Sequence, residues 1–337
     1  GGSIIGTGLG VYSPGTAYVL LHHAMGDVDG NVGSWGFARG GMGSVAAALS
    51  SSLLSFGGTI RKSSEVKKII VSNQTATGVE LVSGEVINAN AIISNLDAKR
   101  TFLKIIDESD LPEDIVKRAK NFKIRGSSGK VNIALDGMPI FPALPDKSPL
   151  TLGHMHFSDT LERLERAYDD WKDDRWSSDP YVDMVIPTQY DPTMAPPGKH
   201  MMSVFVQYCP VSPEGGWDDK KKKAFGDTVI NQIGDYSPNF KDLILHAEIR
   251  TPHEIEKEVG LTEGNIFQGE LTLDQLMFNR PFPGYAQYRG PLKRMYMCSS
   301  SNHPGGGVMG APGANAAREI LRDFKRKNTT PEDFGDD

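Results

Sequence analysis

The sequence predicts a mixed α/β fold with two domains, and three observations support this prediction. Between residues 59 and 94, short β-rich segments are separated by turn signals at Ser72–Asn73 and Ser83–Gly84. Apolar residues recur at helical spacing over 110–122 and 158–174. Near the carboxyl end, a strand, a glycine-rich turn and a helix follow one another. The length of 337 residues is enough for two domains of ordinary size.

The expected elements follow in chain order. A helix is expected over 14–26, and a second one, rich in Ala, Leu and Ser, begins after the glycines at 40–43 and ends at Gly57. Strands are then expected at Thr59–Arg61, Val66–Val71, Gly78–Leu81, Glu85–Asn88 and Ala91–Ser94. Asp97 and Arg100 are expected to cap the start of another helix. The region 101–283 reads as an α+β domain with a mixed sheet, its helices at 110–122, 158–174 and 224–238 and its strands at 130–137, 181–189 and 200–210.

The segment from Met295 onward carries the most information. Met295–Cys298 reads as a strand, Gly305 to Gly307 as a turn, and the helix is expected to begin near Val308 or Gly310 and to end near Lys325. A helix amino terminus has unpaired N–H groups and a partial positive charge. The terminus near Gly307 therefore suits an electron-rich acceptor.

The opening "IIGTGLG" is a partial match to a dinucleotide-binding loop. Gly6 and Gly8 fit the G-x-G-x-x-G pattern, but Val11 occupies the third glycine position. The acids expected about 20 residues later, Asp27 and Asp29, lie in "GDVDGN", which is typical of a turn. We therefore interpret this segment as a loop that leads into the first helix.

Composition excludes several classes of function. A net charge of -6 gives no reason to expect a nucleic-acid partner, and "KKKK" at 220–223 is interpreted as a solvated helix face. The only cysteines, Cys209 and Cys298, are far apart, so a disulfide framework, a cysteine zinc site and a dithiol centre are not expected. His154 and His156 share one face of a strand but lack a third ligand nearby, so no metal is expected. No apolar stretch approaches the roughly 18 residues of a membrane span, nothing indicates membrane contact, and a reducing, cytoplasmic compartment is expected.

Six segments together resemble the phytoene desaturase-like branch of the FAD-dependent amine oxidase superfamily. They are "SPGTAYVLLHHAMG", "GGMGSVAAALSSSL", "GVELVSGEVINANAIISNLDAKRTFL", "PTMAPPGKHMMSVFVQY", "GNIFQGELTLDQLMFNRP" and "HPGGGVMGAPGANAA". The resemblance implies FAD bound across a Rossmann-like domain formed by 37–105 and 284–327, and a substrate domain formed by 1–36 and 106–283. The acidic segment "PEDFGDD" separately predicts a disordered tail at 328–337. The family's phosphate loop would lie upstream, so this chain is expected to be a fragment that holds part of a flavin site and is inactive alone.

The resemblance also implies which residues approach the cofactor. The backbone of Val66 would face the adenine, and Ser94 and Asn95 would lie near the cofactor. Backbone amides of the closing motif would reach the ribityl chain and the flavin C2 carbonyl; the matching positions are Ser300, Gly306, Gly307, Val308 and Met309.

The reaction implied is hydride transfer from a C–H bond of a small, apolar organic substrate to flavin N5, with reoxidation by a quinone or oxygen. In a eukaryote the mitochondrial matrix is the expected compartment. Two alternatives stay open: a non-catalytic regulatory or interaction protein on a flavoprotein scaffold, and an amine oxidase, for which Tyr285 and Tyr288 would form the aromatic pair beside the flavin.

Three histidines are further candidates for the substrate region. His22 and His23 would line a substrate cavity or serve as ordinary core or surface residues. His303 would donate a proton near the flavin or cap the glycine loop. Tyr285 and Tyr288 would shape the cavity or stabilise a domain junction.

Overall fold

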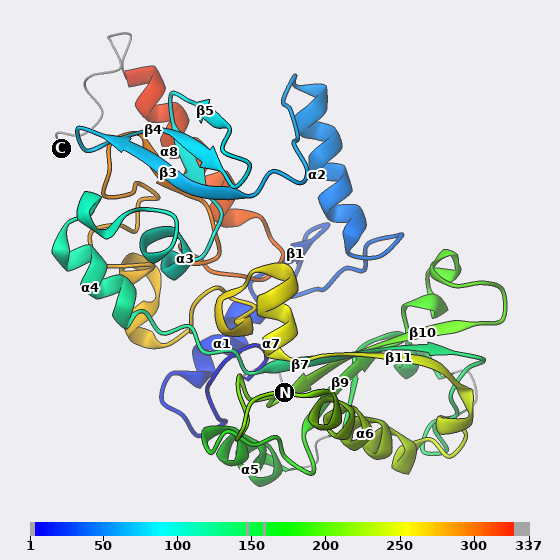
Figure 1. The fold of residues 1–337 in the computed structure, drawn as a ribbon. Coiled ribbons are helices and arrows are strands. Elements are labelled where there is room, and N and C mark those ends of the chain that lie inside the picture. Colours follow the sequence, from blue (N-terminus) through cyan, green and yellow to red (C-terminus); the bar gives the residue numbers. More distant parts are fainter. Residues whose placement is uncertain (1–3, 146–147, 158–159, 327–337) are drawn as a thin grey trace. The chain divides into compact units, whose positions relative to one another are not determined.

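The structure, a computed structural model, describes residues 4–145, 148–157 and 160–326 (Figure 1). The chain divides into two compact units. Unit 1 comprises 1–60 and 126–264, and unit 2 comprises 61–125 and 265–337. These limits differ from the domain boundaries expected at 37, 105 and 284, because 37–60 belongs to unit 1 whereas 106–125 and 265–283 belong to unit 2. The expected disordered tail at 328–337 lies outside the described residues.

Unit 1 is built around a five-stranded sheet in the order β11-β7-β10-β9-β8. Its strands are β7 (Ser128–Leu135), β8 (Met155–His156), β9 (Tyr181–Val185), β10 (His200–Gln207) and β11 (Ile244–Arg250). Every pair is antiparallel, which corrects the expectation of a mixed sheet. The connections explain the difference, since parallel neighbours are usually joined by a crossover α-helix and the 14 residues between β9 and β10 contain only short 3-10 helices.

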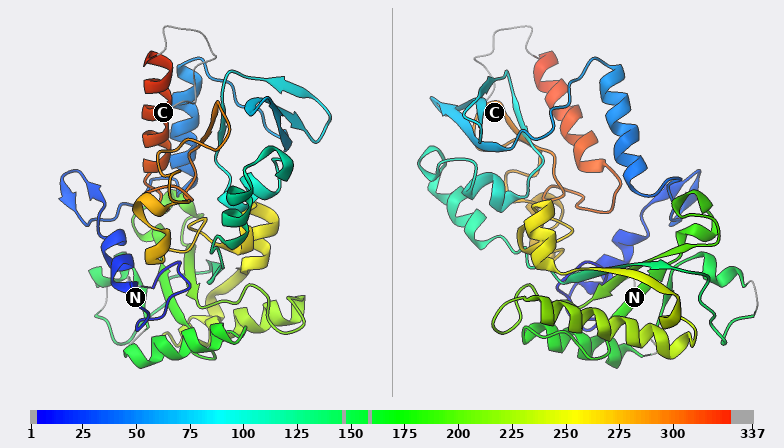
Figure 2. Two further views of the ribbon diagram at one scale, coloured as in Figure 1. Left: turned by 90° about the vertical axis from the view of Figure 1, so that its left-hand side faces the viewer. Right: turned by 45° about the vertical axis from the view of Figure 1, so that its right-hand side comes forward.

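One face of this sheet packs against a helix. Alternate residues of the strands point to the same face, and on one side these are aliphatic: Val131, Ile133, Val182, Met184, Met202 and Val204. They form a core with Phe225, Val229 and Ile233 of α6 (Asp219–Tyr236), which lies along the sheet in both views of Figure 2. The lysine run at 220–223 occupies the first turns of α6, as predicted.

The remaining elements of unit 1 include four helices and a hairpin. They are α1 (Thr16–His23), β1 (Asp27–Val28), β2 (Asn31–Val32), α2 (Gly43–Ser55), α5 (Leu161–Lys172) and α7 (Pro252–Glu254). The "GDVDGN" turn is confirmed as the β1–β2 hairpin, whose central Asp29 and Gly30 both have positive φ.

The opening glycine segment packs against α5. A Cβ on Gly8 would lie 2.7 Å from Trp171, and one on Gly10 would lie 2.4 Å from both Glu165 and Tyr168. Residues 4–8 form turns and bends, which agrees with the interpretation of this segment as a loop. The glycines of this segment therefore serve close packing within unit 1.

Unit 2 contains two small sheets. The antiparallel sheet β3-β4-β5 consists of Val66–Ser72, Thr75–Leu81 and Val86–Asn88, and the parallel pair consists of β6 (Ile92–Ser94) and β12 (Met295–Met297). The strand expected at Thr59–Arg61 is absent, since these residues are irregular. The helices are α3 (Ala98–Leu103), α4 (Glu113–Asn121) and α8 (Ala311–Arg326).

Asp97 caps α3, as the sequence predicts. Its Oδ1 accepts the backbone N–H of Arg100 at 3.0 Å, and the carboxylate also lies 3.8 Å from the Arg100 guanidinium. Asp97 is only 1% exposed, so water cannot replace the cap.

Replacing Asp97 with alanine is expected to lower the free energy of unfolding by about 1–2 kcal/mol, because a buried helix N–H loses its acceptor. Asp97→Asn is the matched control, since asparagine caps as well as aspartate. Urea unfolding followed by circular dichroism measures both. Equal losses in the two variants would show that the cap contributes nothing.

Candidate functional site

The segment 298–310 between β12 and α8, which we name the closing loop, starts at a shared edge of the parallel pair. Ser94 of β6 pairs with Met297 of β12, so the loops that follow both strands begin side by side. Cys298 donates its N–H to the Ser94 carbonyl at 2.9 Å, and Ala98 donates its N–H to Ser301 Oγ at 3.0 Å. The carboxyl edge of parallel strands is where α/β proteins bind ligands. The structure therefore brings the predicted Ser94 and Ser300 segments together.

The amides at the end of the closing loop fit an electron-rich group. Among the described residues, no acceptor pairs with the backbone N–H groups of Gly307, Val308 and Met309. These residues are exposed and directly precede α8, which begins at Ala311, close to the predicted start. Unpaired N–H groups at a helix amino terminus favour partial negative charge. The edge of a flavin that carries a carbonyl, whose charge grows on reduction, has this property.

A buried arginine holds the start of the closing loop, and nothing in the sequence singled it out. Arg280 is completely buried, and its Nε and Nη2 donate to the Ser300 carbonyl at 3.0 and 2.8 Å. The same guanidinium donates to four other carbonyls, those of Phe267, Gly269, Glu270 and Gln275. Gln268 adds a side-chain bond, since its Oε1 accepts the Ser300 N–H at 2.9 Å. Arg280 thus fixes the backbone from which the loop departs.

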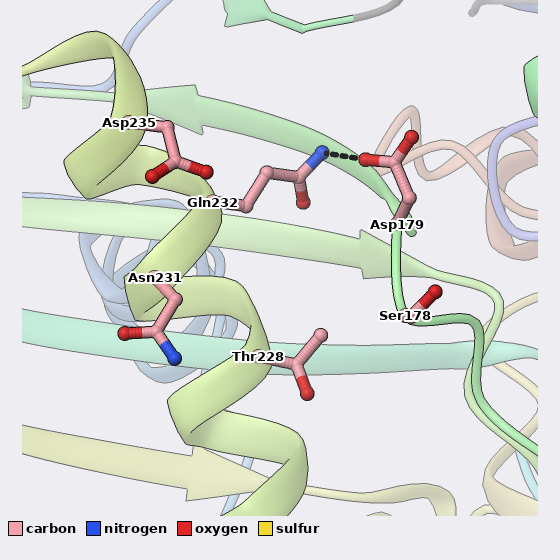
Figure 3. A pocket seen from close by; sticks show the side chains of 6 residues that line it. All are labelled: Ser178, Asp179, Thr228, Asn231, Gln232 and Asp235. Atoms are coloured by element: carbon pink, nitrogen blue, oxygen red, sulfur yellow. Dashed lines mark hydrogen bonds between the residues drawn. The ribbon is translucent and has the colours of Figure 1, made fainter.

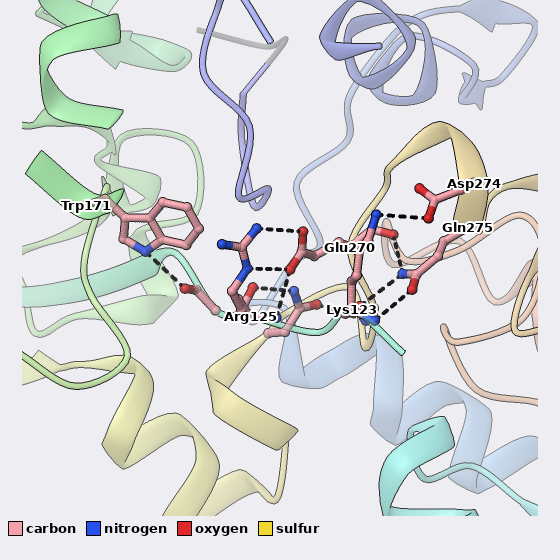
Figure 4. Close-up of polar contacts among 9 residues, drawn as sticks. Lys123, Arg125, Trp171, Glu270, Asp274 and Gln275 are labelled. Atoms are coloured by element: carbon pink, nitrogen blue, oxygen red, sulfur yellow. Dashed lines mark hydrogen bonds and ion pairs between the residues drawn. The ribbon is translucent and has the colours of Figure 1, made fainter. Parts of the chain in front are cut away.

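The segment 265–275 is itself held by charged and polar contacts within unit 2 (Figure 4). Glu270 is 2% exposed, and its carboxylate accepts hydrogen bonds from Nε and Nη2 of Arg125 at 2.8 and 3.2 Å. Gln275 accepts the N–H of Lys123 at 2.7 Å and donates to its carbonyl at 2.9 Å, while the Lys123 ammonium pairs with Asp274. These contacts fix both the chain that surrounds Arg280 and the glutamine that holds Ser300.

The other predicted cofactor residues occupy different surroundings. Ser94 is buried and its hydroxyl bonds to Thr101 Oγ1 at 2.8 Å, so its side chain serves the local structure. Asn95 is exposed beside it. Val66 is the first residue of β3 and pairs with Leu81 in the other sheet. The contacts of these residues with a cofactor stay predictions.

Tyr288 stabilises the closing loop. Its hydroxyl donates to the His303 carbonyl at 2.8 Å and accepts Nδ2 of Asn315 in α8, also at 2.8 Å. Burial, and then the positive charge of Arg280, lower the pKa of His303, which favours the neutral imidazole. Tyr285 packs at the edge of the unit 2 core, where burial raises its pKa.

His22 and His23 lie in unit 1, on the last turn of α1. His22 is 2% exposed. His23 donates Nδ1–H to the Val19 carbonyl at 2.8 Å, and its ring stacks on Trp35 with centroids 5.9 Å apart. His23 thus belongs to a group of rings that also includes Phe37 and Tyr190, whose centroids are 4.4 Å apart.

The second face of the unit 1 sheet carries charged side chains beside aromatic ones, and the sequence analysis did not assign it. Strand register places Lys130 of β7, Phe205 of β10 and Asp183 of β9 in one row, with His156 of β8 opposite Asp183. Lys130 donates to Ser203 Oγ at 2.7 Å, and burial lowers its pKa although the charge of Asp183 opposes this. The period-2 alternation in "SGKVNIAL" and "YVDMV" is the signal that could have revealed this face.

Asp183 connects this face of the sheet to the aromatic rings of Trp35 and Phe37, through its contact with His154. Its Oδ1 lies 2.8 Å from Nδ1 of His154, and Oδ2 lies 3.4 Å from the Tyr181 hydroxyl, whose pKa is raised chiefly by burial. The His154 ring contacts Trp35 edge-on at 5.3 Å and stacks on Phe37 at 5.9 Å. Among the described residues, no cluster of His, Cys, Asp and Glu could hold a metal ion.

A separate polar pocket lies between α6 and the chain that precedes β9 (Figure 3). Its lining residues are Ser178, Asp179, Thr228, Asn231, Gln232 and Asp235. Asp179 already pairs with Arg163 and accepts Nε2 of Gln232 at 3.0 Å. None of the predicted site residues lines this pocket.

Comparison with known proteins identifies the family. Residues 4–246 match the family described as flavin-containing amine oxidoreductase. The chain belongs to this family. It is 39% identical over 333 residues to pyridine nucleotide-disulfide oxidoreductase domain-containing protein 2 of Rattus norvegicus, covering 96% of this chain and 57% of the relative. It is 25% identical to phytoene desaturase of Phycomyces blakesleeanus, covering 89% of this chain and 50% of that protein.

The fold agrees with the family. An oxidoreductase from Methanosarcina mazei superimposes with a TM-score of 0.52 at 17% identity, covering 84% of this chain and 55% of that one. The predicted α/β flavoprotein class and the resemblance to the phytoene desaturase-like branch are thus confirmed. The chain spans only 50–57% of the length of the two relatives. Within the described residues, no helix is both long and apolar enough to cross a membrane.

Proposed function

We propose that the protein is an FAD-dependent oxidoreductase of the dehydrogenase or desaturase type, which oxidises a C–H bond of an apolar organic substrate. The observation that carries this proposal is the closing loop, where three exposed backbone amides precede a 16-residue helix at the carboxyl edge of two parallel strands. The flavin family and the relative named phytoene desaturase support it.

The chain's own contribution is to hold the cofactor and to place the substrate. The N–H groups of Gly307, Val308 and Met309 would hold the electron-rich edge of the flavin, which supplies hydride acceptance when it is bound. Arg280 and Gln268 hold the closing loop in place through their hydrogen bonds with the backbone of Ser300. A quinone or oxygen would then regenerate the oxidised cofactor.

The relative named phytoene desaturase favours an apolar substrate. Amine oxidation remains the second candidate, because the family's description names amine oxidoreductases.

The test uses the longer protein that carries this sequence. We expect it to purify with a flavin absorption band at about 450 nm, and we expect phytoene to bleach that band in the absence of oxygen. A primary amine such as cyclohexylamine serves as the comparison substrate. Bleaching by the amine alone would favour amine oxidation, and a protein that takes up no FAD would contradict the proposal. In parallel, the isolated chain of 337 residues is mixed with FAD and separated from unbound FAD by gel filtration. A visible band that stays with the chain would refute the expectation that it holds only part of the site.

A further inference from the structure

The polar pocket beside α6 has a volume of about 240 Å³ and lies entirely within unit 1. Two of its lining residues, Ser178 and Asp179, belong to the chain that precedes β9. The other four lie on α6 at intervals of three, one and three positions: Thr228, Asn231, Gln232 and Asp235. Side chains three or four positions apart meet on the surface of a helix, so α6 presents one continuous polar face to the pocket (Figure 3).

A buried amide oxygen at this pocket has no hydrogen-bond partner among the described residues. Gln232 is 6% exposed, and its enclosed Oε1 is unpaired. The nitrogen of the same amide is held, since Nε2 donates to Asp179 Oδ1 and to the Pro180 carbonyl, both at 3.0 Å. These two bonds fix the orientation of the amide, and Figure 3 shows Oε1 directed between Thr228 and Ser178. A buried acceptor without a partner is unfavourable, so a donor from outside the chain would stabilise this oxygen.

The neighbouring side chains on α6 add further acceptors. The Thr228 hydroxyl donates its proton to the Ala224 carbonyl at 3.0 Å, which leaves the lone pairs of its oxygen to accept. The Asp235 carboxylate is exposed, and within the described part of the chain it has neither a hydrogen bond nor an ion pair. Together with Gln232 Oε1, these groups fit a ligand that carries several N–H donors.

The pocket also has an excess of negative charge. Arg163 pairs with Asp179, so these two charges offset each other and Asp235 supplies the excess. Asp235 lies in the last turn of α6, where the helix carries partial negative charge and has no basic side chain. A metal ion fits poorly, because no group of three or more His, Cys, Asp or Glu residues that could hold one exists among the described residues. A single positive charge on an organic body suits both the charge and the volume.

We propose that this pocket binds a primary alkylammonium ion. The three N–H groups of the ammonium would donate to Gln232 Oε1, to the Asp235 carboxylate and to the Thr228 oxygen, and its positive charge would offset that of Asp235. The carbon chain would extend into the rest of the pocket. The cofactor residues predicted from the sequence all belong to unit 2, so this binding site is independent of the proposed oxidation and of its substrate.

The test titrates the longer protein that carries this sequence with butylammonium chloride, followed by isothermal titration calorimetry. One saturable binding event per chain is expected. Butanol has a similar length but no charge and a single donor, so it is expected not to bind at the same concentrations. Absence of butylammonium binding, or equal binding of butanol, would overturn the proposal.

Two variants of α6 locate the binding event. Asp235→Asn is expected to weaken butylammonium binding at least about tenfold, because it removes the unpaired charge and keeps the shape of the side chain. Asp235 is exposed and unpaired among the described residues, so this variant should fold normally. Asp227→Asn is the matched control, since it removes one negative charge from the same helix at a residue that pairs with Lys223 and does not line the pocket.

The comparison of these variants decides the assignment. Normal affinity in Asp227→Asn with a loss in Asp235→Asn would support the pocket as the binding site. Normal affinity in Asp235→Asn would overturn the assignment, and so would equal losses in the two variants, which would show only a general attraction between the cation and an acidic protein. Neither of these results would affect the proposed function, because flavin reduction by phytoene is measured separately.

Discussion

Replacing Arg280 with methionine is expected to unfold unit 2, at a cost of more than about 5 kcal/mol. The guanidinium is fully buried and donates to the carbonyl oxygens of five residues, namely Phe267, Gly269, Glu270, Gln275 and Ser300. Methionine fills part of the volume but offers no donor. Each buried acceptor left without a partner costs about 1–3 kcal/mol, and such sums exceed what a marginally stable unit tolerates.

The distribution of tryptophan makes this prediction measurable unit by unit. All four tryptophans of the chain, at positions 35, 171, 176 and 217, belong to unit 1, so their fluorescence reports on that unit. Circular dichroism reports on both units, because unit 2 contains α3, α4 and α8. In Arg280→Met we expect ellipticity to be lost at low urea while the tryptophan transition stays near its normal midpoint.

Arg61→Met is the control for this experiment. Arg61 lies in the same unit and pairs with Glu85, but both side chains are nearly half exposed. A surface ion pair contributes about 1 kcal/mol or less. If the two variants unfold alike, the buried guanidinium does not hold the segment together.

The sequence predicted those features that depend on neighbours along the chain. Asp97 at a helix start and the strand, turn and helix from Met295 onward were placed within a few residues. These signals are local because caps, glycine turns and helical periodicity each act over a single turn. The segment Thr59–Arg61 shows the limit, since β-forming residues without a pairing partner remain irregular.

The features that the sequence did not reveal depend on residues far apart in the chain. In the sequence, nothing distinguishes Arg280 from a surface arginine. Only in the folded chain do the carbonyls of 267–275 and of Ser300 surround its guanidinium. Asp183 and His154 are 29 residues apart, and Lys130 joins their row only through strand register. Register is a property of the assembled sheet, so no local pattern could have brought these side chains together.

Gly306 of the closing loop should tolerate a side chain poorly, for a steric reason. A Cβ at this position would lie 2.7 Å from Phe267 Cδ1 and 3.4 Å from Phe267 Cα. Phe267 is 5% exposed and its carbonyl accepts Nη2 of Arg280 at 2.9 Å, so it cannot move aside without disturbing that network. We expect Gly306→Val to lower the free energy of unfolding by about 1–3 kcal/mol through overpacking.

The same substitution should weaken FAD binding at least about tenfold, or about 1.4 kcal/mol. The loop would shift away from Phe267 and carry the amides of Gly307, Val308 and Met309 with it. Gly313→Ala is the matched control, because no heavy atom lies within 4 Å of its Cβ position and alanine stabilises a helix by about 0.5–1 kcal/mol. Titration of the apoprotein with FAD, followed by flavin fluorescence, measures both variants. Equal affinities would show that FAD binding does not depend on this loop. A loss of affinity in Gly306→Val alone would show that FAD binding depends on the packing of Gly306 against Phe267.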